Sequence, residues 1–141
     1  MNKISKIFVD SDPFVALAKV DDINHQNAVG ILKSLIEQSA NFFTSSYVFS
    51  ECITVISMRV GHDEAIKFID AMQSKESKFV VERIDESIEI DAVRVFKEQE
   101  SKNTSFVDCT NMALIRKLHA DAIFSFDTVY KQNGILMVAD L

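Results

Sequence analysis

The amino-acid sequence predicts an α/β fold, a three-layer sandwich in which a central, mainly parallel sheet of about five strands is flanked by helices. Short apolar runs alternate with longer segments of helical periodicity, as expected when helices connect parallel strands. Only 3 Gly and 1 Pro occur among the 141 residues, which favours long helices and few free linkers. We see no repeat or domain boundary and expect one domain over residues 1–141.

Short runs rich in β-branched and aromatic residues mark the predicted strands. They are Lys6–Asp10, Asn41–Thr44, Lys78–Ile84, Ala122–Phe126 and Ile135–Val138. Each run is too short for a helix and is bounded by polar residues, which favours buried strands.

Helical spacing of apolar residues fills most of the chain between these runs. Asp12 and Pro13 suit the N-cap and the first position of the first helix. Ser45 or Ser46 is expected to cap a long helix that ends at Gly61. The other predicted helices cover residues 25–38, 62–74, 87–100, 106–119 and 127–133, and residues 101–105 are the best loop candidate.

Four acidic residues follow or interrupt apolar runs: Asp10, Glu51, Asp108 and Asp127. A carboxylate in apolar surroundings is costly unless something positive accompanies it. Right-handed crossovers bring the carboxyl ends of parallel strands to one rim, where ligands bind. Asp10 and Asp127 directly follow strands, and the other two acids lie near the starts of helices that reach the same rim. We therefore expect the four side chains to bind Mg²⁺ or Mn²⁺, which prefer oxygen ligands.

Each acid also has a simpler structural interpretation. Asp10 is a common type of turn residue, and Asp127 could cap the short helix after it. Asp108 completes an S-x-x-D capping pattern with Ser105, a role compatible with metal binding because a capped helix end fixes the acid in place. Glu51 is the hardest to explain structurally, because three of its near neighbours on the helix surface are apolar.

Composition limits the class of protein. The net charge is −6 and the pI is about 5.0, which argues against indiscriminate nucleic-acid binding, although bound cations would offset the acidity. No apolar stretch approaches the roughly 20 residues of a membrane span, and residues 1–6 do not resemble a secretory signal. Cys52 and Cys109 are expected to be free thiols in a reducing compartment, so we expect a cytoplasmic protein. The His and Cys residues lack the spacing of a zinc site.

Four segments carry a family resemblance in the order D, E, D, D. They are Phe8–Ser11, Thr44–Glu51, Ser105–Asp108 and Ile123–Asp127. Together they span nearly the whole chain and resemble the PIN-domain family of metal-dependent ribonucleases, especially the VapC-type toxins of bacterial toxin–antitoxin pairs. The resemblance implies a PIN-like parallel sheet, a homodimer and an antitoxin that blocks the site.

The resemblance also implies roles for individual residues. Asp10, Glu51, Asp108 and Asp127 would be the catalytic, metal-binding acids. Ser11 and Ser105 would be supporting hydroxyls, and Asn111, one turn after Asp108, is a further supporting candidate. Asp12 is an acid beyond the family pattern, and Arg59 and Lys102 are candidates for the basic residue that family sites often carry. Whether one or two ions bind is left open.

The expected function is therefore Mg²⁺-dependent endoribonuclease activity on RNA, as the toxin of a type II toxin–antitoxin pair. A PIN-domain nuclease that processes RNA without being a toxin is an alternative. So is a haloacid-dehalogenase-type phosphatase, because Val9–Asp12 contains D-x-D with Asp10 as nucleophile and Asp12 as acid/base. A non-catalytic binding module that keeps the fold is the last alternative.

Overall fold

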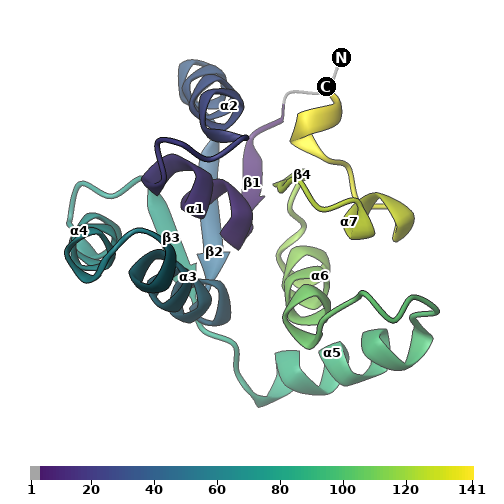
Figure 1. Cartoon of the computed structure of the whole chain (residues 1–141). Helices are drawn as coiled ribbons and strands as arrows, with labels where there is room; N and C mark the ends of the chain where they lie inside the picture. Colours follow the sequence, from purple (N-terminus) through teal and green to yellow (C-terminus); the bar gives the residue numbers. More distant parts are fainter. Residues whose placement is uncertain (1–3) are drawn as a thin grey trace.

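A sheet of four parallel strands lies at the centre of the computed structural model, which describes residues 4–141. The first three residues of the segment considered above for secretion lie outside the described residues. The strand order is β3-β2-β1-β4 (Figure 1). The strands are β1 (Lys6–Val9), β2 (Asn41–Ser45), β3 (Phe79–Glu82) and β4 (Ala122–Phe124). The α/β three-layer prediction is thus confirmed.

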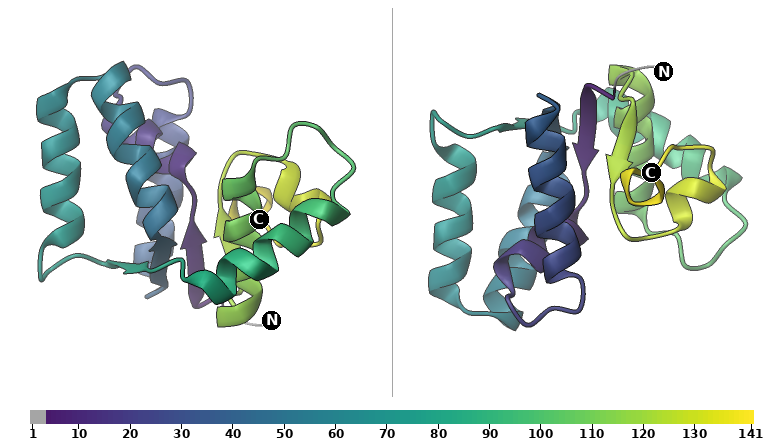
Figure 2. Two further views of the ribbon diagram at one scale, coloured as in Figure 1. Left: turned by 90° about the horizontal axis from the view of Figure 1, so that it is seen from below. Right: turned by 90° about the horizontal axis from the view of Figure 1, so that it is seen from above.

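Helices cover both faces of the sheet. The first four lie on one side and the last three on the other, with the sheet between them (Figure 2). Their bounds are α1 Ser11–Ala18, α2 His25–Glu37, α3 Ser46–Arg59, α4 His62–Gln73, α5 Glu86–Glu98, α6 Phe106–Leu118 and α7 Val129–Gln132. Within residues 4–141, none of the helices is both long enough and apolar enough to cross a membrane.

The predicted fifth strand is wrong. Residues 135–138 make one isolated bridge to the sheet, from Met137 to Ile123, and the chain then turns into a short 3₁₀ helix at Val138–Asp140. Met137 and Val138 are nevertheless buried. The apolar run therefore indicates that residues 135–138 are buried against β4. This burial needs only a single bridge and no ladder of hydrogen bonds between strands.

The start of the first helix also differs from the prediction. Helix α1 begins at Ser11, and Asp10 is its N-cap, with a side-chain oxygen that accepts the Ser11 N–H. Asp12 therefore lies inside the first helical turn and is free to bond elsewhere. Of the two serines offered as the cap of α3, Ser45 takes the role by accepting the Val48 N–H at 3.0 Å.

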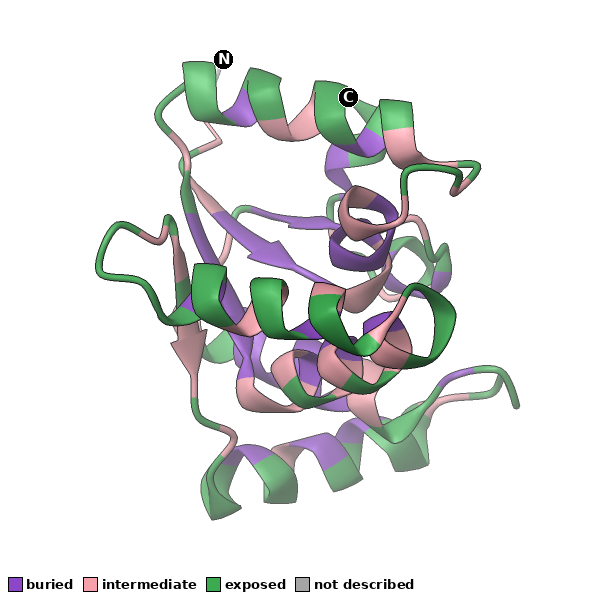
Figure 3. Cartoon of the chain, turned by 60° about the vertical axis from the view of Figure 1, so that its left-hand side comes forward, coloured by how far each residue is buried: buried purple, intermediate pink, exposed green. Residues whose placement is uncertain are grey.

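The core is built around β1, whose residues Ile7, Phe8 and Val9 are almost fully buried. Strands β1, β2 and β4 are buried along most of their length, whereas β3, at the edge of the sheet, is only partly buried (Figure 3). A central parallel strand reads as an uninterrupted apolar run because helices cover both of its faces. Phe8 packs edge-to-face on Phe43 of β2, with ring centroids 5.2 Å apart.

The strand order places a topological switch point next to β1. The chain runs outward from β1 through β2 to β3, and then returns to add β4 on the opposite side of β1. In such sheets ligands bind in the crevice outside the carboxyl ends of the strands where the direction of winding reverses. The residues that follow β1 and β4 therefore occupy the position where a site is expected.

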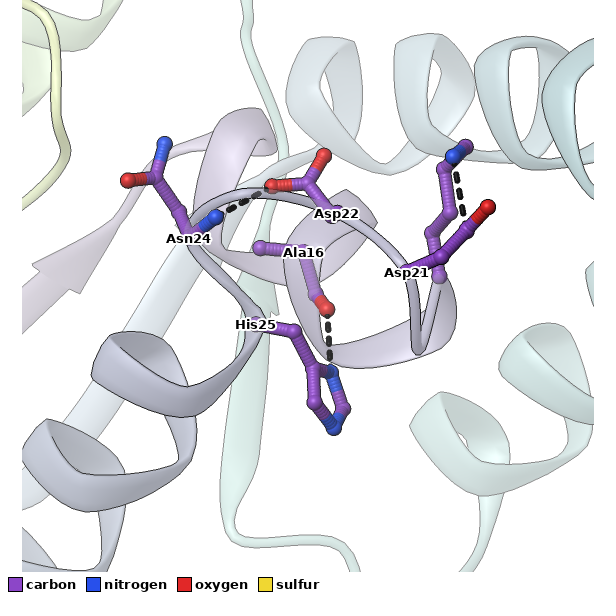
Figure 4. A network of polar contacts seen from close by, with 6 residues as sticks. Ala16, Asp21, Asp22, Asn24 and His25 are labelled. Atoms are coloured by element: carbon purple, nitrogen blue, oxygen red, sulfur yellow. Dashed lines mark hydrogen bonds and ion pairs between the residues drawn. The ribbon is translucent and has the colours of Figure 1, made fainter.

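Local contacts fix the loop between α1 and α2 (Figure 4). Asp22 accepts the Asn24 N–H at 2.8 Å, and Lys19 pairs with Asp21 at 2.7 Å. His25 Nδ1 lies 2.7 Å from the carbonyl oxygen of Ala16. A carbonyl only accepts, so Nδ1 carries the proton and the ring serves to join α2 to α1.

Candidate active site

Asp10 lies at the carboxyl end of β1 and is only 5% exposed. Its Oδ1 accepts hydrogen bonds from the Ser11 N–H at 2.8 Å and from Asn111 Nδ2 at 3.2 Å. Its Oδ2 accepts from Ser125 Oγ at 2.9 Å and from the Tyr130 hydroxyl at 3.0 Å. A carboxylate offers about four lone-pair positions, so these four groups occupy the capacity of Asp10 when both hydroxyl protons point toward it.

Tyr130, on α7, joins Asp10 to Asp108. Its hydroxyl oxygen accepts from Asn111 Nδ2 at 2.9 Å and lies 3.0 Å from Asp10 Oδ2 and 3.0 Å from Asp108 Oδ1. The hydroxyl has one proton and faces two carboxylate oxygens. One of the two contacts therefore lacks a proton unless a carboxyl group is itself protonated.

Ser125 plays a similar part on the other side of Asp10. Its hydroxyl lies 2.9 Å from Asp10 Oδ2 and 3.3 Å from Asp12 Oδ1, and it accepts the Asp127 N–H at 3.1 Å. The other oxygen of Asp12 accepts the Phe126 N–H at 2.8 Å. Asp12 thus binds the segment after β4 to the first turn of α1.

Asp108 carries the capping role offered as its simpler interpretation. Its Oδ2 accepts the Ser105 N–H at 2.9 Å, while Ser105 Oγ accepts the Asp108 N–H at 3.0 Å, so the reciprocal capping box of α6 is complete. Its Oδ1 points to Tyr130. The Asp108 carboxylate therefore caps the helix with one oxygen and faces the aspartate cluster with the other, so the two roles are compatible.

Asp127 also has both a local and a site contact. Its Oδ1 accepts the Val129 N–H at 3.0 Å, at the start of α7. Its N–H donates to Ser125 Oγ at 3.1 Å, and Ser125 also contacts Asp10 and Asp12, so the main chain of Asp127 borders the cluster. Its charge adds to the rise in the pKa of Asp12. The structure thus brings Asp10, Asp12, Asp108 and Asp127 together at the carboxyl ends of β1 and β4.

Glu51 lies beside this cluster and is not bonded into it. Its side chain is half-buried on α3 and lines a surface hollow together with Tyr47 and Val107, the neighbour of Asp108. Burial, followed by the charges of Asp10, Glu51 and Asp12, raises the pKa of the Cys52 thiol, so the glutamate is within electrostatic reach of that thiol. The sequence predicted apolar surroundings for Glu51. These are only partly present, because the hollow is open to solvent.

The supporting residues differ in how they contribute. Asn111 is fully buried and donates to both Asp10 and Tyr130. The contacts of Ser11 go through its main chain, which donates to Asp10 and whose carbonyl oxygen lies 3.9 Å from Cys52 Sγ. Cys52 and Cys109 are free, buried thiols, as expected.

Electrostatics in the cluster favour a cation. Burial, with the Asp12 charge next, raises the pKa of Asp10 to about 7, and burial raises the pKa of Asp12 to about 6. The four ion pairs within residues 4–141 all lie elsewhere. The basic candidates Arg59, the last residue of α3, and Lys102, in the loop before α6, are exposed.

The residues fit a hydrated Mg²⁺ better than a metal held by protein ligands alone. In the described part of the chain, no three His, Cys, Asp or Glu side chains are grouped closely enough to hold an ion by themselves. Mg²⁺ commonly uses one or two carboxylates and keeps several waters. The cluster offers only oxygen donors, and its two shared hydroxyl protons face four carboxylate contacts, so positive charge is lacking.

Sequence reasoning missed Tyr130 and Ser125. Ser125 lies inside the Ile123–Asp127 motif, where its position two residues before Asp127 was the available signal. Tyr130 lies in α7, three residues after Asp127. A tyrosine there reads as an ordinary core aromatic, and only the fold shows that its hydroxyl meets Asp10, 120 residues away in the chain.

Comparison with known proteins agrees with the fold. The chain is 27% identical over 132 residues to the 23S rRNA-specific endonuclease VapC20 of Mycobacterium tuberculosis, covering 94% of this chain and 97% of that protein. The crystal structure of VapC20, a sarcin-ricin loop cleaving toxin, superposes with a TM-score of 0.80 over 92% of this chain and 96% of that one. FitAcB from Neisseria gonorrhoeae shares the fold, with a TM-score of 0.69, 14% identity and coverage of 93% and 95%. The sequence profile of the PIN domain matches residues 7–136, and the chain belongs to the PIN-domain family.

Proposed function

We propose that the chain is a Mg²⁺-dependent endoribonuclease that hydrolyses phosphodiester bonds in RNA. The observation that supports this most directly is the aspartate cluster of Asp10, Asp12, Asp108 and Asp127 at the carboxyl ends of β1 and β4. It lies at the switch point of a PIN-family sheet, and the VapC20 relative is an endonuclease that acts on 23S rRNA. Ribosomal RNA is therefore the first substrate to test.

The residues would have different roles. Asp10, Asp108, Asp127 and Glu51 would hold the cation, directly or through the waters that it keeps, with Asp10 at the centre because it contacts both hydroxyl bridges. A divalent cation bound there supplies a Lewis acid and activates water for attack on phosphorus. Ser125, Asn111 and the capped end of α6 would keep the carboxylates aligned, and Asp12 would hold the segment after β4 in place.

The test is Asp10→Asn, with Asp70→Asn as the matched control because Asp70 is exposed on α4. Cleavage of a ribosomal RNA fragment should require added Mg²⁺, stop with EDTA, and be lost in Asp10→Asn. The control should cleave like the wild type, and the circular dichroism spectra of all three proteins should agree. Equal cleavage by the Asp10→Asn protein would reject the assignment.

We further propose that the chain is the toxin of a type II toxin–antitoxin pair, acts in the cytoplasm and forms a homodimer. The toxin relative VapC20 supports the first part. Expression of the chain alone should arrest bacterial growth, and Asp10→Asn should remove the arrest. Co-expression of the small protein encoded by a neighbouring reading frame should restore growth and yield a co-purifying complex. An active nuclease that leaves growth unaffected would favour an RNA-processing role instead.

A further inference from the structure

Tyr130 is the largest fully buried side chain of the site, and its hydroxyl is the only one within residues 4–141 that bonds to both Asp10 and Asp108. Asn111 donates to the hydroxyl oxygen at 2.9 Å, so the single hydroxyl proton is directed toward the carboxylates. The tyrosine thus takes the position between two acids that a cation would be expected to neutralise.

The hydrogen bonds of Asp10 limit how a cation can reach it. All four of its lone-pair positions face a hydrogen-bonding group, so direct coordination requires one of these contacts to be released. The Ser11 N–H is fixed as part of the N-cap of α1. Ser125 is held by the Asp127 N–H and also serves Asp12. Asn111 would leave a buried N–H without its acceptor, and the other acceptor of Ser125, Asp12 Oδ1, is 3.3 Å away. The Tyr130 hydroxyl keeps a shorter bond of 3.0 Å to Asp108 and the Asn111 donor after it leaves Asp10, so its bond to Asp10 is the least costly to release.

We propose that the Tyr130 hydroxyl is a placeholder for the divalent cation. In the cation-free protein it donates between Asp10 and Asp108 and reduces their repulsion. When Asp10 takes the cation, the contact between Tyr130 and Asp10 is released. The inference rests on the proposed function only in assuming that Asp10 is a metal ligand. Tyr130 is accordingly a positioning residue that competes with the cation.

The first test compares Mn²⁺ binding by the wild type and Tyr130→Phe, measured by titration calorimetry and by thermal shift. Phenylalanine keeps the ring and removes the competing hydroxyl, so the half-saturating Mn²⁺ concentration should fall about fivefold, the size expected for one released hydrogen bond. Leu35→Val is the control, because it trims the core on α2 and leaves the cluster intact. The control should lower the melting temperature without changing the half-saturating concentration. An unchanged or higher concentration for Tyr130→Phe would overturn the proposal.

The second test keeps Tyr130 and reads its hydroxyl directly. The chain has 2 Tyr and no Trp, so Tyr47→Phe leaves Tyr130 as the only tyrosine emitter. A tyrosine hydroxyl bonded to a carboxylate is quenched by proton transfer in the excited state. Release of Asp10 removes one of the two carboxylate acceptors and leaves Asp108, so addition of Mg²⁺, which is diamagnetic, should raise the emission of Tyr47→Phe in part, whereas Tyr130→Phe should show no such rise. Saturating Mg²⁺ that leaves the emission of Tyr47→Phe unchanged would contradict release of the contact.

The outcomes separate this inference from the proposed function. If the wild type binds Mn²⁺ and cleaves RNA, but Tyr130→Phe binds no more tightly and the emission stays constant, the placeholder role fails and the nuclease assignment stands. If Tyr130→Phe alters binding as expected while no RNA is cleaved, the cation site stands and the nuclease assignment fails.

Discussion

Asn111 and Asp10 are 101 residues apart in sequence and are joined by a hydrogen bond of 3.2 Å inside the site. The same amide nitrogen donates to Tyr130, so both N–H groups of Asn111 serve the cluster. Its Oδ1 is buried and has no partner within residues 4–141. The two hydrogen bonds that the amide donates to Asp10 and Tyr130 thus fix its orientation, and they join α6 to the end of β1.

Asn111→Ala should destabilise the protein by about 1–3 kcal/mol, because Asp10 and Tyr130 both lose a donor in a buried setting. Urea denaturation followed by circular dichroism measures the loss. Asn103→Ala, in the exposed loop before α6, is the matched control and should stay within about 0.5 kcal/mol of the wild type. Equal unfolding midpoints for the two variants would show that the amide does not support the cluster.

Stability of the cation-free protein should fall as pH rises from about 4 to about 7. The pKa values of Asp10 and Asp12 are raised from 3.8 to about 7 and about 6, so the folded state holds protons that the unfolded state has released in this range. Their stabilising contribution is complete below about pH 4 and is lost through the raised values. The loss should amount to several kcal/mol, because each tenfold difference in proton affinity between the folded and unfolded states is worth roughly 1.4 kcal/mol, and the affinities of Asp10 and Asp12 differ about a thousandfold and about a hundredfold.

The measurement is the free energy of unfolding in urea with EDTA present, at several values of pH. Saturating Mg²⁺ should flatten the profile, because the cation replaces the protons as the source of positive charge. Asp10→Asn should also flatten it, since the amide does not titrate. A profile that rises from pH 5 to pH 7 in the cation-free wild type would contradict the raised pKa values.

Variants of Ser105 and Asp108 should separate the contribution to helix capping from the contribution to RNA cleavage. Ser105→Ala removes the acceptor of the Asp108 N–H and should cost about 1 kcal/mol of stability with modest loss of cleavage. Asp108→Asn keeps an oxygen that can accept the Ser105 N–H, so the helix cap survives. It should nevertheless lower cleavage by about 100-fold or more, as expected for a group that holds the cation. Paired measurements of the unfolding midpoint and the cleavage rate check both variants.

Asp121 should contribute to stability in the opposite pH direction. Its Oδ2 accepts the N–H groups of Ser5 and Lys6 at 2.9 and 2.8 Å, and these bonds lower its pKa. The contribution is present above its unfolded pKa of about 3.9 and is lost as pH falls through the lowered value. In Asp121→Ala the amides of Ser5 and Lys6 should exchange with deuterium faster than in the wild type at neutral pH. Unchanged exchange at both amides would show that the carboxylate does not secure the start of β1.

The elements that sequence predicted well are those controlled by neighbouring residues. The Ser105–Asp108 capping box and the start of α6 follow from contacts three residues apart, and they formed as expected. The apolar run Ile7–Val9 predicts a buried central strand, because helices cover both faces of such a strand. Residues 135–138 show the limit, since the same apolar pattern served a single bridge and a 3₁₀ turn.

The site was predicted in part for a related reason. Placing Asp10, Asp108 and Asp127 at one rim needed only the handedness of crossovers and parallel strands. Glu51 lies half-buried next to the cluster, without a bond to it, because the surface hollow on α3 leaves its side chain in contact with solvent. Asp12 seemed to be a cap, and the structure gives that role to Asp10, two residues earlier in the chain.

The sequence by itself determined the α/β class, the helices, the capping box of α6, and the acids that border the apolar strands. Only the tertiary structure decided that Tyr130 and Ser125 bridge those acids, and that Asp12 binds the segment after β4. Apolar periodicity and helix capping depend on contacts within one helical turn or one strand, so neighbouring residues in the sequence are enough to predict them. The bridges join groups more than 100 residues apart, and they exist because β4 adds beside β1 and brings their carboxyl ends together.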